Sequence, residues 1–363
     1  MTRALGALAF LIVPMLVNAQ SPNPSVDSAM ATYARPNGPG ASLLVIHDGT
    51  VAYQKSYGLA NVERDERVTP QTDFRLASLS KQFTATAVMM LVADGKLHYD
   101  DDISTRLAGL PAFAKGVTVR NLLNHTSGLP DYEDFVPDSQ TAQVYDVDVP
   151  RLISSANGMK FAPGTRYAYS NTGYCLLALI VEHVSGKHFA DVLHERIFAP
   201  LGMTSSLAFV NGKSTVPHRA YGYSVNVKGV RLTDQSNTSA TLGDGGIYTS
   251  TVDLAKWDRA LERHTLVSAA EQQLAWTPPS LPNGAATEYG FGWFIDHARG
   301  TTRLWHYGES RGFTNTILRY PERRLTVVIL SNRTGGAPWD IAEQVADLYL
   351  PPGSGQATVP RRP

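Results

Sequence analysis

Two strand–turn–strand patterns lie at opposite ends of this 363-residue chain, and they restrict the folds open to it. Near the N-terminus, residues 41–57 are rich in apolar and β-branched side chains and surround Asp48-Gly49, a dipeptide typical of tight hairpin turns. Near the C-terminus, residues 313–330 repeat this arrangement around a second turn. Because hairpin strands are antiparallel, we expect one antiparallel sheet that is assembled from both ends of the chain.

The sequence between these hairpins is mostly helical in pattern, with long loops. Apolar spacing predicts helices near residues 78–94, 119–124, 171–184, 189–198, 253–263 and 339–350, with the 189–198 helix closed by Pro200, and further strands near 289–295 and 304–306. We therefore predict an α+β fold, with an antiparallel sheet flanked by helices and an inserted, mostly helical lobe. Residues 20–95 and 245–350 are expected to form the α/β region with the sheet, and residues 96–244 the helical region.

The two ends of the chain are not predicted to be part of the folded domain. Arg3 precedes an apolar run from Ala4 to Val17, and residues 17–19 have the small side chains of a cleavage site. This pattern predicts a removable signal peptide at residues 1–19, no membrane span after its removal, and a periplasmic or secreted protein. The less favoured alternative is an anchor that is not cleaved. Residues 351–363 are expected to be a disordered tail.

Charge and cysteine content exclude several classes of function. The formal net charge is +0, which gives no reason to expect nucleic acid as a partner. The single cysteine, Cys175, has no partner for a disulfide and lies in an apolar helical pattern, which is typical of a core residue. His183, His188 and His194 are spaced five and six residues apart and do not share one helix face, so no metal site is expected.

The first candidate for chemistry is Ser78, followed three residues later by Lys81. Residues i and i+3 of a helix share one face, so a helix beginning near Ser78 places the amine beside the hydroxyl. The exposed backbone N–H groups of the first turn lie close to both. This is the minimum arrangement for a serine nucleophile without a His–Asp pair. The plainer alternative is that Ser78 caps the helix.

The second and third candidates are Tyr169 with Asn171, in a loop that opens a helix, and His306 with Gly308, in a strand. A tyrosine acts as a general base only when its pKa is lowered, for example by a nearby ammonium such as that of Lys81. Asn171 can hold that amine or a substrate amide. The alternatives are an exposed tyrosine, an asparagine cap and a packed strand histidine.

Gly308 and its neighbour Glu309 follow His306 on the same strand. Residues 306 and 308 face the same side of a strand, and a glycine there leaves room for an acyl group. The N–H of Glu309 is a candidate to join that of Ser78 in an oxyanion hole.

In this order and at these separations, the three motifs resemble those of the serine β-lactamase and penicillin-binding protein superfamily. The resemblance is greatest to its class C β-lactamase, D-aminopeptidase and family VIII esterase branch, and it spans residues 41–332. Further segments that support it lie at residues 122–129, 161–164, 199–203 and 243–246.

The resemblance implies a β-lactamase/transpeptidase-like fold and a catalytic cycle through an acyl-enzyme on Ser78. It makes Lys81 the activating partner and Tyr169 the proton shuttle. Asn171, His306, Gly308 and Glu309 become substrate-side residues, and no cofactor or metal is implied. Which of Lys81 and Tyr169 takes the first proton stays open, because strongly coupled groups titrate as a unit.

The third motif departs from the family pattern, since it is H-Y-G where β-lactam-hydrolysing relatives have K-T-G. His306 is only partly charged near neutral pH, and Tyr307 lacks the threonine hydroxyl. Glu309 adds a negative charge that repels an anionic substrate if its side chain points inward.

We therefore expect a serine hydrolase for a neutral or cationic amide or ester, with a small molecule or peptide as substrate, rather than an efficient β-lactamase. The alternatives are a penicillin-recognising sensor or scaffold without turnover and, less favoured, a dedicated β-lactamase. Oligomeric state stays open.

A rival nucleophile is Ser310, because residues 308–312 match the G-x-S-x-G elbow of α/β-hydrolases. In that fold the catalytic histidine follows the nucleophile in the chain, and no histidine occurs after His306. The elbow also leads from a strand into a helix, whereas residues 313–320 are predicted to be a strand. The sequence therefore favours Ser78.

Overall fold

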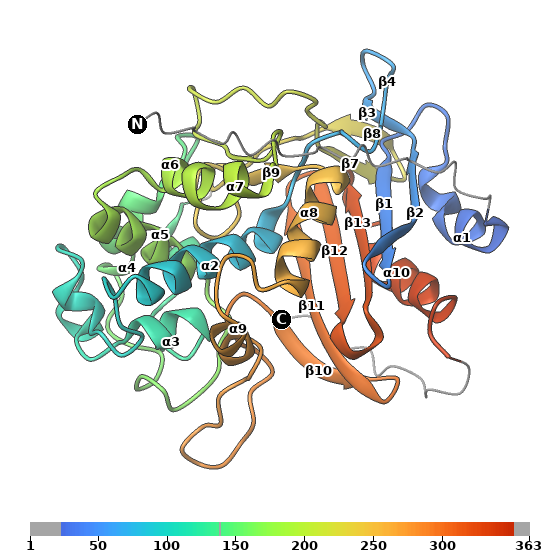
Figure 1. The fold of residues 1–363 in the computed structure, drawn as a ribbon. Helices are drawn as coiled ribbons and strands as arrows, with labels where there is room; N and C mark the ends of the chain where they lie inside the picture. Colours follow the sequence, from blue (N-terminus) through green and yellow to red (C-terminus); the bar gives the residue numbers. More distant parts are fainter. Residues whose placement is uncertain (1–22, 138, 352–363) are drawn as a thin grey trace, which may run out of the picture.

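The computed structural model describes residues 23–137 and 139–351, and its centre is a six-stranded antiparallel sheet (Figure 1). The strand order is β10-β11-β12-β13-β1-β2. The bounds of these strands are β1 (Ala41–His47), β2 (Thr50–Tyr57), β10 (Phe294–Ala298), β11 (Thr301–Ser310), β12 (Phe313–Tyr320) and β13 (Leu325–Ser331). The proposed signal peptide at residues 1–19 and, apart from Pro351, the proposed tail lie outside the described residues.

The two ends of the chain meet in the middle of this sheet, as predicted. Strand β1 pairs with β13 from Ala41↔Ser331 to His47↔Leu325. Almost every residue of β1 and every residue of β13 is buried, because helices cover both faces of the sheet there. Strand β2 is at the edge and has more exposed residues, which is the expected pattern for an edge strand.

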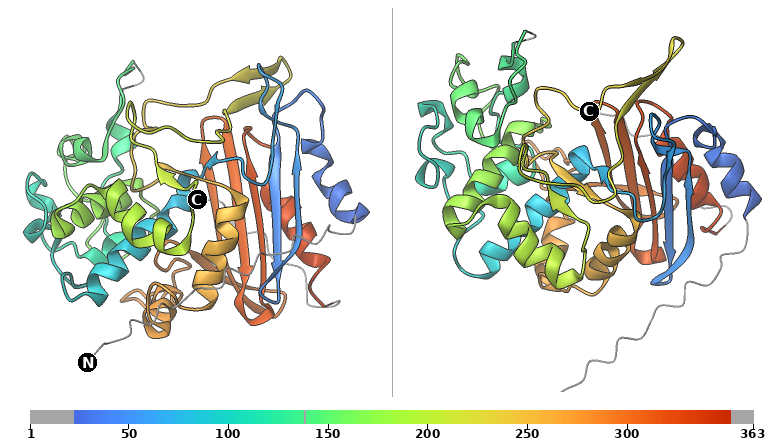
Figure 2. Two further views of the ribbon diagram at one scale, coloured as in Figure 1. Left: turned by 45° about the horizontal axis from the view of Figure 1, so that its top comes forward. Right: turned by 90° about the horizontal axis from the view of Figure 1, so that it is seen from above.

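Helices cover the two faces of the sheet differently (Figures 1 and 2). On one face, α10 (Pro338–Asp347) packs against β12 and β13, with α1 (Pro24–Ala29) beside it. On the other face, α8 (Thr251–Glu262) packs against β1 and β13. Helix α2 (Lys81–Ala93) lies between the sheet and the helical region, where it packs against α5 (Asn171–Ser185) and α6 (Phe189–Leu193).

The remaining elements are short. The helices are α3 (Val119–Leu123), α4 (Val149–Ile153), α7 (Ala199–Leu201) and α9 (Ala269–Ala275), with a π-helical turn at His194–Phe198 between α6 and α7. Small strand pairs are formed by β3 (Leu59–Asn61) with β4 (Glu66–Arg67), by β5 (Phe74–Arg75) and β6 (Leu207–Ala208) with β9 (Ile247–Thr249), and by β7 (Tyr223–Asn226) with β8 (Gly229–Leu232). None of the helices in the described part of the chain has the length and apolar character that a membrane span needs.

Two sequence-based predictions of local structure were wrong. Residues 289–295 were expected to be a strand, but β10 begins only at Phe294. The preceding residues form a loop because Gly292 has a φ of 78°, which a continuous strand does not permit. Pro200 was expected to close the helix after Phe189, but it lies inside α7, and the left-handed Gly202 ends that helix.

Candidate active site

Ser78 lies in a 3₁₀ turn, Ala77–Ser80, that leads directly into helix α2. It is the one residue between Thr72 and Leu91 that is not buried, so its hydroxyl is open to a substrate. Ala77, just before it, has a φ of 50°, in the left-handed region that non-glycine residues rarely adopt. Such strain persists only where the surroundings impose it, and it often marks functional sites.

Lys81 is fully buried beside Ser78 and is held by three acceptors. Its Nζ donates to the Ser78 hydroxyl at 3.0 Å, to Oδ1 of Asn171 at 2.8 Å and to the carbonyl oxygen of Asp244 at 2.9 Å. Burial lowers the pKa of Lys81, because the charged amine loses its hydration. The predicted pairing of hydroxyl and amine is therefore present, in a setting that favours a neutral amine.

Three carboxylates near Lys81 oppose this shift, and the sequence analysis did not identify them as part of the site. The charges of Asp244, Asp131 and Glu133 each favour the ammonium and partly offset the effect of burial on its pKa. Asp244 lies in the loop of residues 243–246, which the sequence marked only as a family signature. The loop is tied to α2 because the Thr84 hydroxyl donates to the Gly243 carbonyl at 2.6 Å.

Tyr169 packs against Lys81, with the Nζ atom 5.0 Å from the centre of its ring. The Ser78 hydroxyl, by itself, would lower the pKa of Tyr169 and favour the phenolate. However, burial in an aromatic cluster has the larger effect and raises the pKa of Tyr169. The condition under which Tyr169 would act as a general base, a lowered pKa, is therefore not met, since the cost of burying a phenolate exceeds the attraction of a nearby amine. Tyr169 keeps its proton at neutral pH. The aromatic side chains around it are His125, Tyr289, Phe294 and His306.

Asn171 is the first residue of α5 and connects Lys81 with the acidic side of the site. Its Oδ1 accepts from Lys81, its Nδ2 donates to Glu133 at 3.3 Å, and its backbone N–H donates to Asp131 at 2.7 Å. These bonds fix the orientation of the amide, so the acceptor is presented to the amine.

His306 is fully buried in strand β11 and does not border the pocket that contains Ser78. Its Nδ1 lies 2.7 Å from the carbonyl oxygen of Tyr307, which can only accept, so Nδ1 carries the proton. Its Nε2 lies 3.0 Å from the hydroxyl of Tyr289 and accepts from it. Burial lowers the pKa of His306 to about 3, so the ring is neutral. The structure places this side chain as a packed strand histidine, the alternative that the sequence left open.

Gly308 brings strand β11 close to the turn that carries Ser78. A β-carbon at this position would lie 2.1 Å from the carbonyl oxygen of Leu76, closer than any real contact. The side of the strand that was expected to leave room for an acyl group is thus filled by the turn itself. Glu309 is exposed and borders the pocket. Its N–H, with that of Ser78, remains the predicted oxyanion hole.

Asn315 on β12 is a positioning residue that the sequence analysis missed. Its buried Nδ2 donates to the carbonyl oxygens of Arg75 at 2.8 Å and Leu76 at 3.2 Å, and its Oδ1 accepts from the Ser331 N–H at 3.0 Å. Two strands of the sheet therefore hold the turn before Ser78 in place. An asparagine, a residue type that is depleted in strands, within a predicted strand was the available signal.

The open edge of β11 lies next to this turn. Strand β10 pairs only with Thr301–Trp305, so residues 306–310 have β12 as a partner on one side alone. Beside them is a pocket of about 110 Å³, here called the nucleophile pocket. It is lined by Arg75, Ala77, Ser78, Tyr132, Glu133, Asn171, Ser236, Thr238, Ser239, Thr241, Asp244, Gly245, Glu309 and Ser310. A wider groove of about 580 Å³ shares Glu133, Ser236 and Thr238 with it and extends to Gln140 and Arg311.

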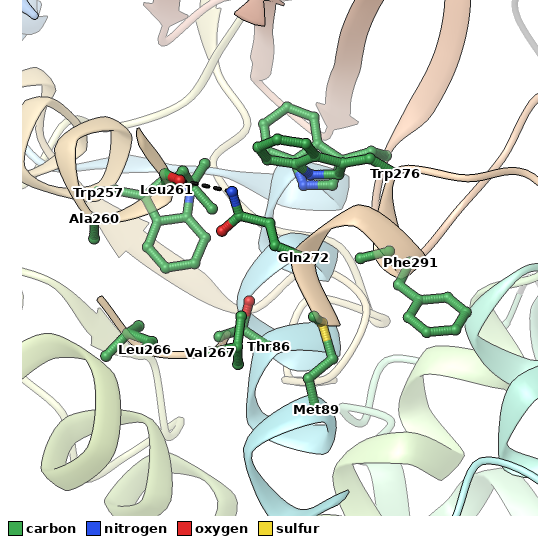
Figure 3. Close-up of a pocket in the computed structure, with 12 residues that line it drawn as sticks. Thr86, Met89, Trp257, Ala260, Leu261, Leu266, Val267, Gln272, Trp276 and Phe291 are labelled. Atoms are coloured by element: carbon green, nitrogen blue, oxygen red, sulfur yellow. Dashed lines mark hydrogen bonds between the residues drawn. The ribbon is translucent and has the colours of Figure 1, made fainter. Parts of the chain in front are cut away.

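A second cavity lies further along α2 but offers no comparable chemistry (Figure 3). Its volume is about 20 Å³, enough for roughly one water molecule and too small for a substrate. Its lining is mostly apolar, and the amide of Gln272 in that lining donates a hydrogen bond to the carbonyl oxygen of Leu261. No group of three or more His, Cys, Asp or Glu in residues 23–137 and 139–351 is placed to hold a metal ion.

The rival nucleophile Ser310 has the wrong local structure for an elbow. It is the last residue of β11, and β12 begins at Phe313, so the segment is a hairpin turn between two strands. The predicted strand at 313–320 is confirmed, and the strand-to-helix turn that exposes an elbow serine is not formed here.

Comparison with known proteins shows several relatives that cover most of the chain. The family model described as Beta-lactamase matches residues 26–350. Penicillin-binding protein 4* of Bacillus subtilis (strain 168) is 33% identical over 338 residues, which cover 84% of this chain and 74% of that protein. A D-aminopeptidase of Gluconobacter oxydans (strain 621H) is 30% identical over 307 residues, which cover 84% of this chain and 58% of that protein. The chain thus spans about three fifths of this relative's length.

Solved structures agree with this similarity. The octameric penicillin-binding protein homologue from Pyrococcus abyssi has a TM-score of 0.77 at 30% sequence identity, covering 90% of this chain and 76% of that one. The D-amino acid amidase from Ochrobactrum anthropi SV3 has a TM-score of 0.75 at 27% identity, covering 90% of this chain and 98% of that one. The geometry around Ser78 thus lies on a fold shared with penicillin-binding proteins and amidases.

Proposed function

Since this chain belongs to the Beta-lactamase family, we propose that it is a serine hydrolase that cleaves amide bonds through an acyl-enzyme on Ser78. The observation that carries the proposal is the arrangement of the Ser78 hydroxyl 3.0 Å from the buried Lys81 amine, with the ring of Tyr169 packed against the same amine. A hydroxyl next to a base and a second proton-transferring group is the pattern of an activated nucleophile.

We propose separate roles for Lys81 and Tyr169, and the directions of their pKa shifts support this division. The lowered pKa of Lys81 makes its neutral form more available, so this amine takes the proton from Ser78 as the hydroxyl attacks the substrate carbonyl. The raised pKa of Tyr169 keeps its phenol protonated, so the phenol donates a proton to the leaving amine and recovers one through Lys81. The backbone N–H groups of Ser78 and Glu309 hold the negative charge that develops on the carbonyl oxygen. Water then releases the acyl group by the reverse sequence.

The relatives support an amide as the scissile group. D-aminopeptidases and a D-amino acid amidase are among the similar proteins, and their names describe cleavage next to D-amino acids. The neutral His306 supports the same choice, because the strand offers no permanent cation of the kind that holds the β-lactam carboxylate in K-T-G relatives. We therefore propose a peptidase or amidase activity, with ester cleavage as a side reaction and slow turnover of β-lactams.

A substrate panel tests the proposal. It comprises D-amino acid anilides, D-alanyl-D-alanine peptides, p-nitrophenyl esters and nitrocefin, each assayed with the wild type and with Ser78→Ala. We expect turnover of at least one amide that Ser78→Ala abolishes. Stable labelling by penicillin without turnover would instead indicate a sensor, absence of any labelling would indicate a scaffold, and nitrocefin as the best substrate would indicate a dedicated β-lactamase.

We also propose that the protein is exported, because the first nineteen residues have the composition of a signal peptide. Cell fractionation followed by N-terminal sequencing tests this. A mature protein beginning near Gln20 outside the cytoplasm is the expected result, and a cytoplasmic protein that retains Met1 would contradict it.

A further inference from the structure

Arg75 is a buried cation in the wall of the nucleophile pocket, and its charge is not neutralised by a carboxylate. It lies three residues before Ser78, and only 2% of its surface is exposed. Its Nη2 donates to the Ser239 carbonyl at 2.7 Å, whereas Nε and Nη1 have no hydrogen-bond partner among the described residues. A guanidinium stays protonated even when buried, so these N–H groups lack both an acceptor and a counter-ion.

The other buried arginines all have a carboxylate partner, which Arg75 lacks. Arg299, Arg303 and Arg319 are the remaining arginines that are buried in residues 23–137 and 139–351. Each of them forms an ion pair, with Glu343, Asp296 and Asp258 respectively. This protein therefore neutralises its buried guanidinium groups, except for the one beside the nucleophile.

A second donor without a partner borders the same pocket. The hydroxyl of Ser310, at the end of β11, is buried and has no hydrogen-bond partner among the described residues. Ser236, Thr238 and Ser239 also line this pocket and carry further hydroxyl groups. Nε and Nη1 lie on different edges of the guanidinium, but Nη2 carries two N–H groups and gives only one of them to Ser239. One complete edge with two N–H donors is therefore still available, and together with the Ser310 hydroxyl it is a favourable set of donors for a carboxylate.

We propose that Arg75 and Ser310 form a carboxylate-binding subsite, and that the amide cleaved at Ser78 belongs to a short peptide or amino-acid conjugate with a free carboxylate. This inference rests on the proposed hydrolase activity for the identity of the substrate, but the subsite can be tested by binding alone. It revises the expectation of a neutral or cationic substrate, which followed from the missing lysine of the third motif. In this chain the cation comes from β5, ahead of the nucleophile.

The acidic groups of the pocket limit how the carboxylate is held. Glu133, Asp244 and Glu309 border the same pocket as Arg75. The average field there therefore does not attract an anion strongly, and the carboxylate must bind by direct hydrogen bonds to the guanidinium. Direct contact predicts a strong effect of replacing Arg75 and a weak effect of removing another positive charge nearby. The adjoining groove leaves room for the rest of a peptide.

The test measures the binding of N-acetyl-D-alanyl-D-alanine and of its C-terminal amide to the Ser78→Ala protein by calorimetry. These two ligands differ only in the carboxylate. We expect the acid to bind at least tenfold more tightly than the amide, and Arg75→Gln, made in the same background, to reduce this ratio to near one. Arg311→Gln is the matched control, because it removes an equal charge from an exposed position in the adjoining groove, and it should retain the preference.

Ser310→Ala keeps the proposal falsifiable if Arg75→Gln does not fold, since this hydroxyl bonds no described residue. It should weaken binding of the acid several-fold more than binding of the amide. The proposal is overturned by equal affinity for acid and amide, by no measurable binding of the acid, or by a preference that survives Arg75→Gln or falls equally in Arg311→Gln. Acid-selective binding without turnover in the wild type would refute the proposed hydrolase and leave the subsite standing. Turnover without a preference for the acid would support the hydrolase and refute the carboxylate-binding subsite.

Discussion

Gly308 lies so close to Leu76 that the strand of the third motif and the turn of the first motif are in direct backbone contact. A β-carbon on Gly308 would be 2.1 Å from the Leu76 carbonyl oxygen. The same carbonyl accepts a hydrogen bond from Asn315. The position of Ser78 is thus determined by the sheet as much as by the helix that follows it.

Gly308→Ala should therefore impair both activity and stability. The added methyl group must displace the turn before Ser78, and overpacking of this kind costs about 1–3 kcal/mol of unfolding free energy. We expect a lower melting temperature and at least a tenfold loss of kcat/KM. Gly38→Ala is the control, because a β-carbon there meets its nearest neighbour, Arg35 Cβ, at 3.4 Å, an ordinary contact. Wild-type activity in Gly308→Ala would show that the contact is not needed.

The pH dependence of kcat/KM should report the titration of Lys81. Burial disfavours the charged amine and lowers its pKa below the ordinary lysine value of 10.5, and only the neutral amine accepts the proton of Ser78. Activity is therefore expected to rise with pH and to reach its plateau below pH 10.5. Lys81→Met should abolish this rise of kcat/KM with pH, here called the basic limb of the pH profile, and should lower the rate by about 10²-fold or more. If the basic limb persists in Lys81→Met, the titrating group is not Lys81.

Two substitutions at Asn171 should shift the basic limb of the pH profile of kcat/KM in opposite directions. Asn171→Asp places a negative charge on the atom 2.8 Å from the amine, which favours the ammonium, so the limb should move to higher pH. Asn171→Ala removes an acceptor that stabilises the ammonium, so the limb should move to lower pH. The pH profiles of kcat/KM for the two variants, measured with one anilide substrate, provide the comparison. Shifts of the same sign would contradict the assignment.

Tyr169→Phe should distinguish between good and poor leaving groups. We propose that the protonated phenol donates a proton to the leaving group. The amine that leaves an amide needs this proton, whereas p-nitrophenolate leaves an ester as a stable anion and does not. We expect hydrolysis of a D-amino acid amide to fall by about 10²–10⁴ and that of the matched p-nitrophenyl ester by much less. An equal loss for both substrates would mean that Tyr169 acts before the leaving group departs, as a base towards Ser78.

Much of the architecture followed from local patterns in the sequence. The Asp48-Gly49 hairpin, the helix that ends at Gly186 and the terminal strands all form as expected, because turn chemistry and apolar periodicity act over a few residues. The loop before Phe294 was mistaken for a strand because its aromatic residues are buried in a side-chain cluster rather than in a sheet.

The sequence predicted the proximity of Ser78 and Lys81, but it did not predict the surroundings of the candidate site. Ser78 and Lys81 are three residues apart, so helix geometry alone brings them together. The burial that neutralises His306 and keeps Tyr169 protonated depends on side chains distant in sequence, which no local pattern reveals. The same is true of Asn315, which bonds the turn from more than 200 residues away, and of the uncompensated charge of Arg75.

The most direct test of this account is to locate the covalent adduct. The wild-type protein is treated with a labelled fluorophosphonate, digested and mapped by mass spectrometry, with a heat-unfolded sample as the control for nonspecific reaction. The account predicts a single adduct on the peptide that contains Ser78, which forms only in the folded protein. An adduct on Ser310, or on any residue other than Ser78, would contradict it.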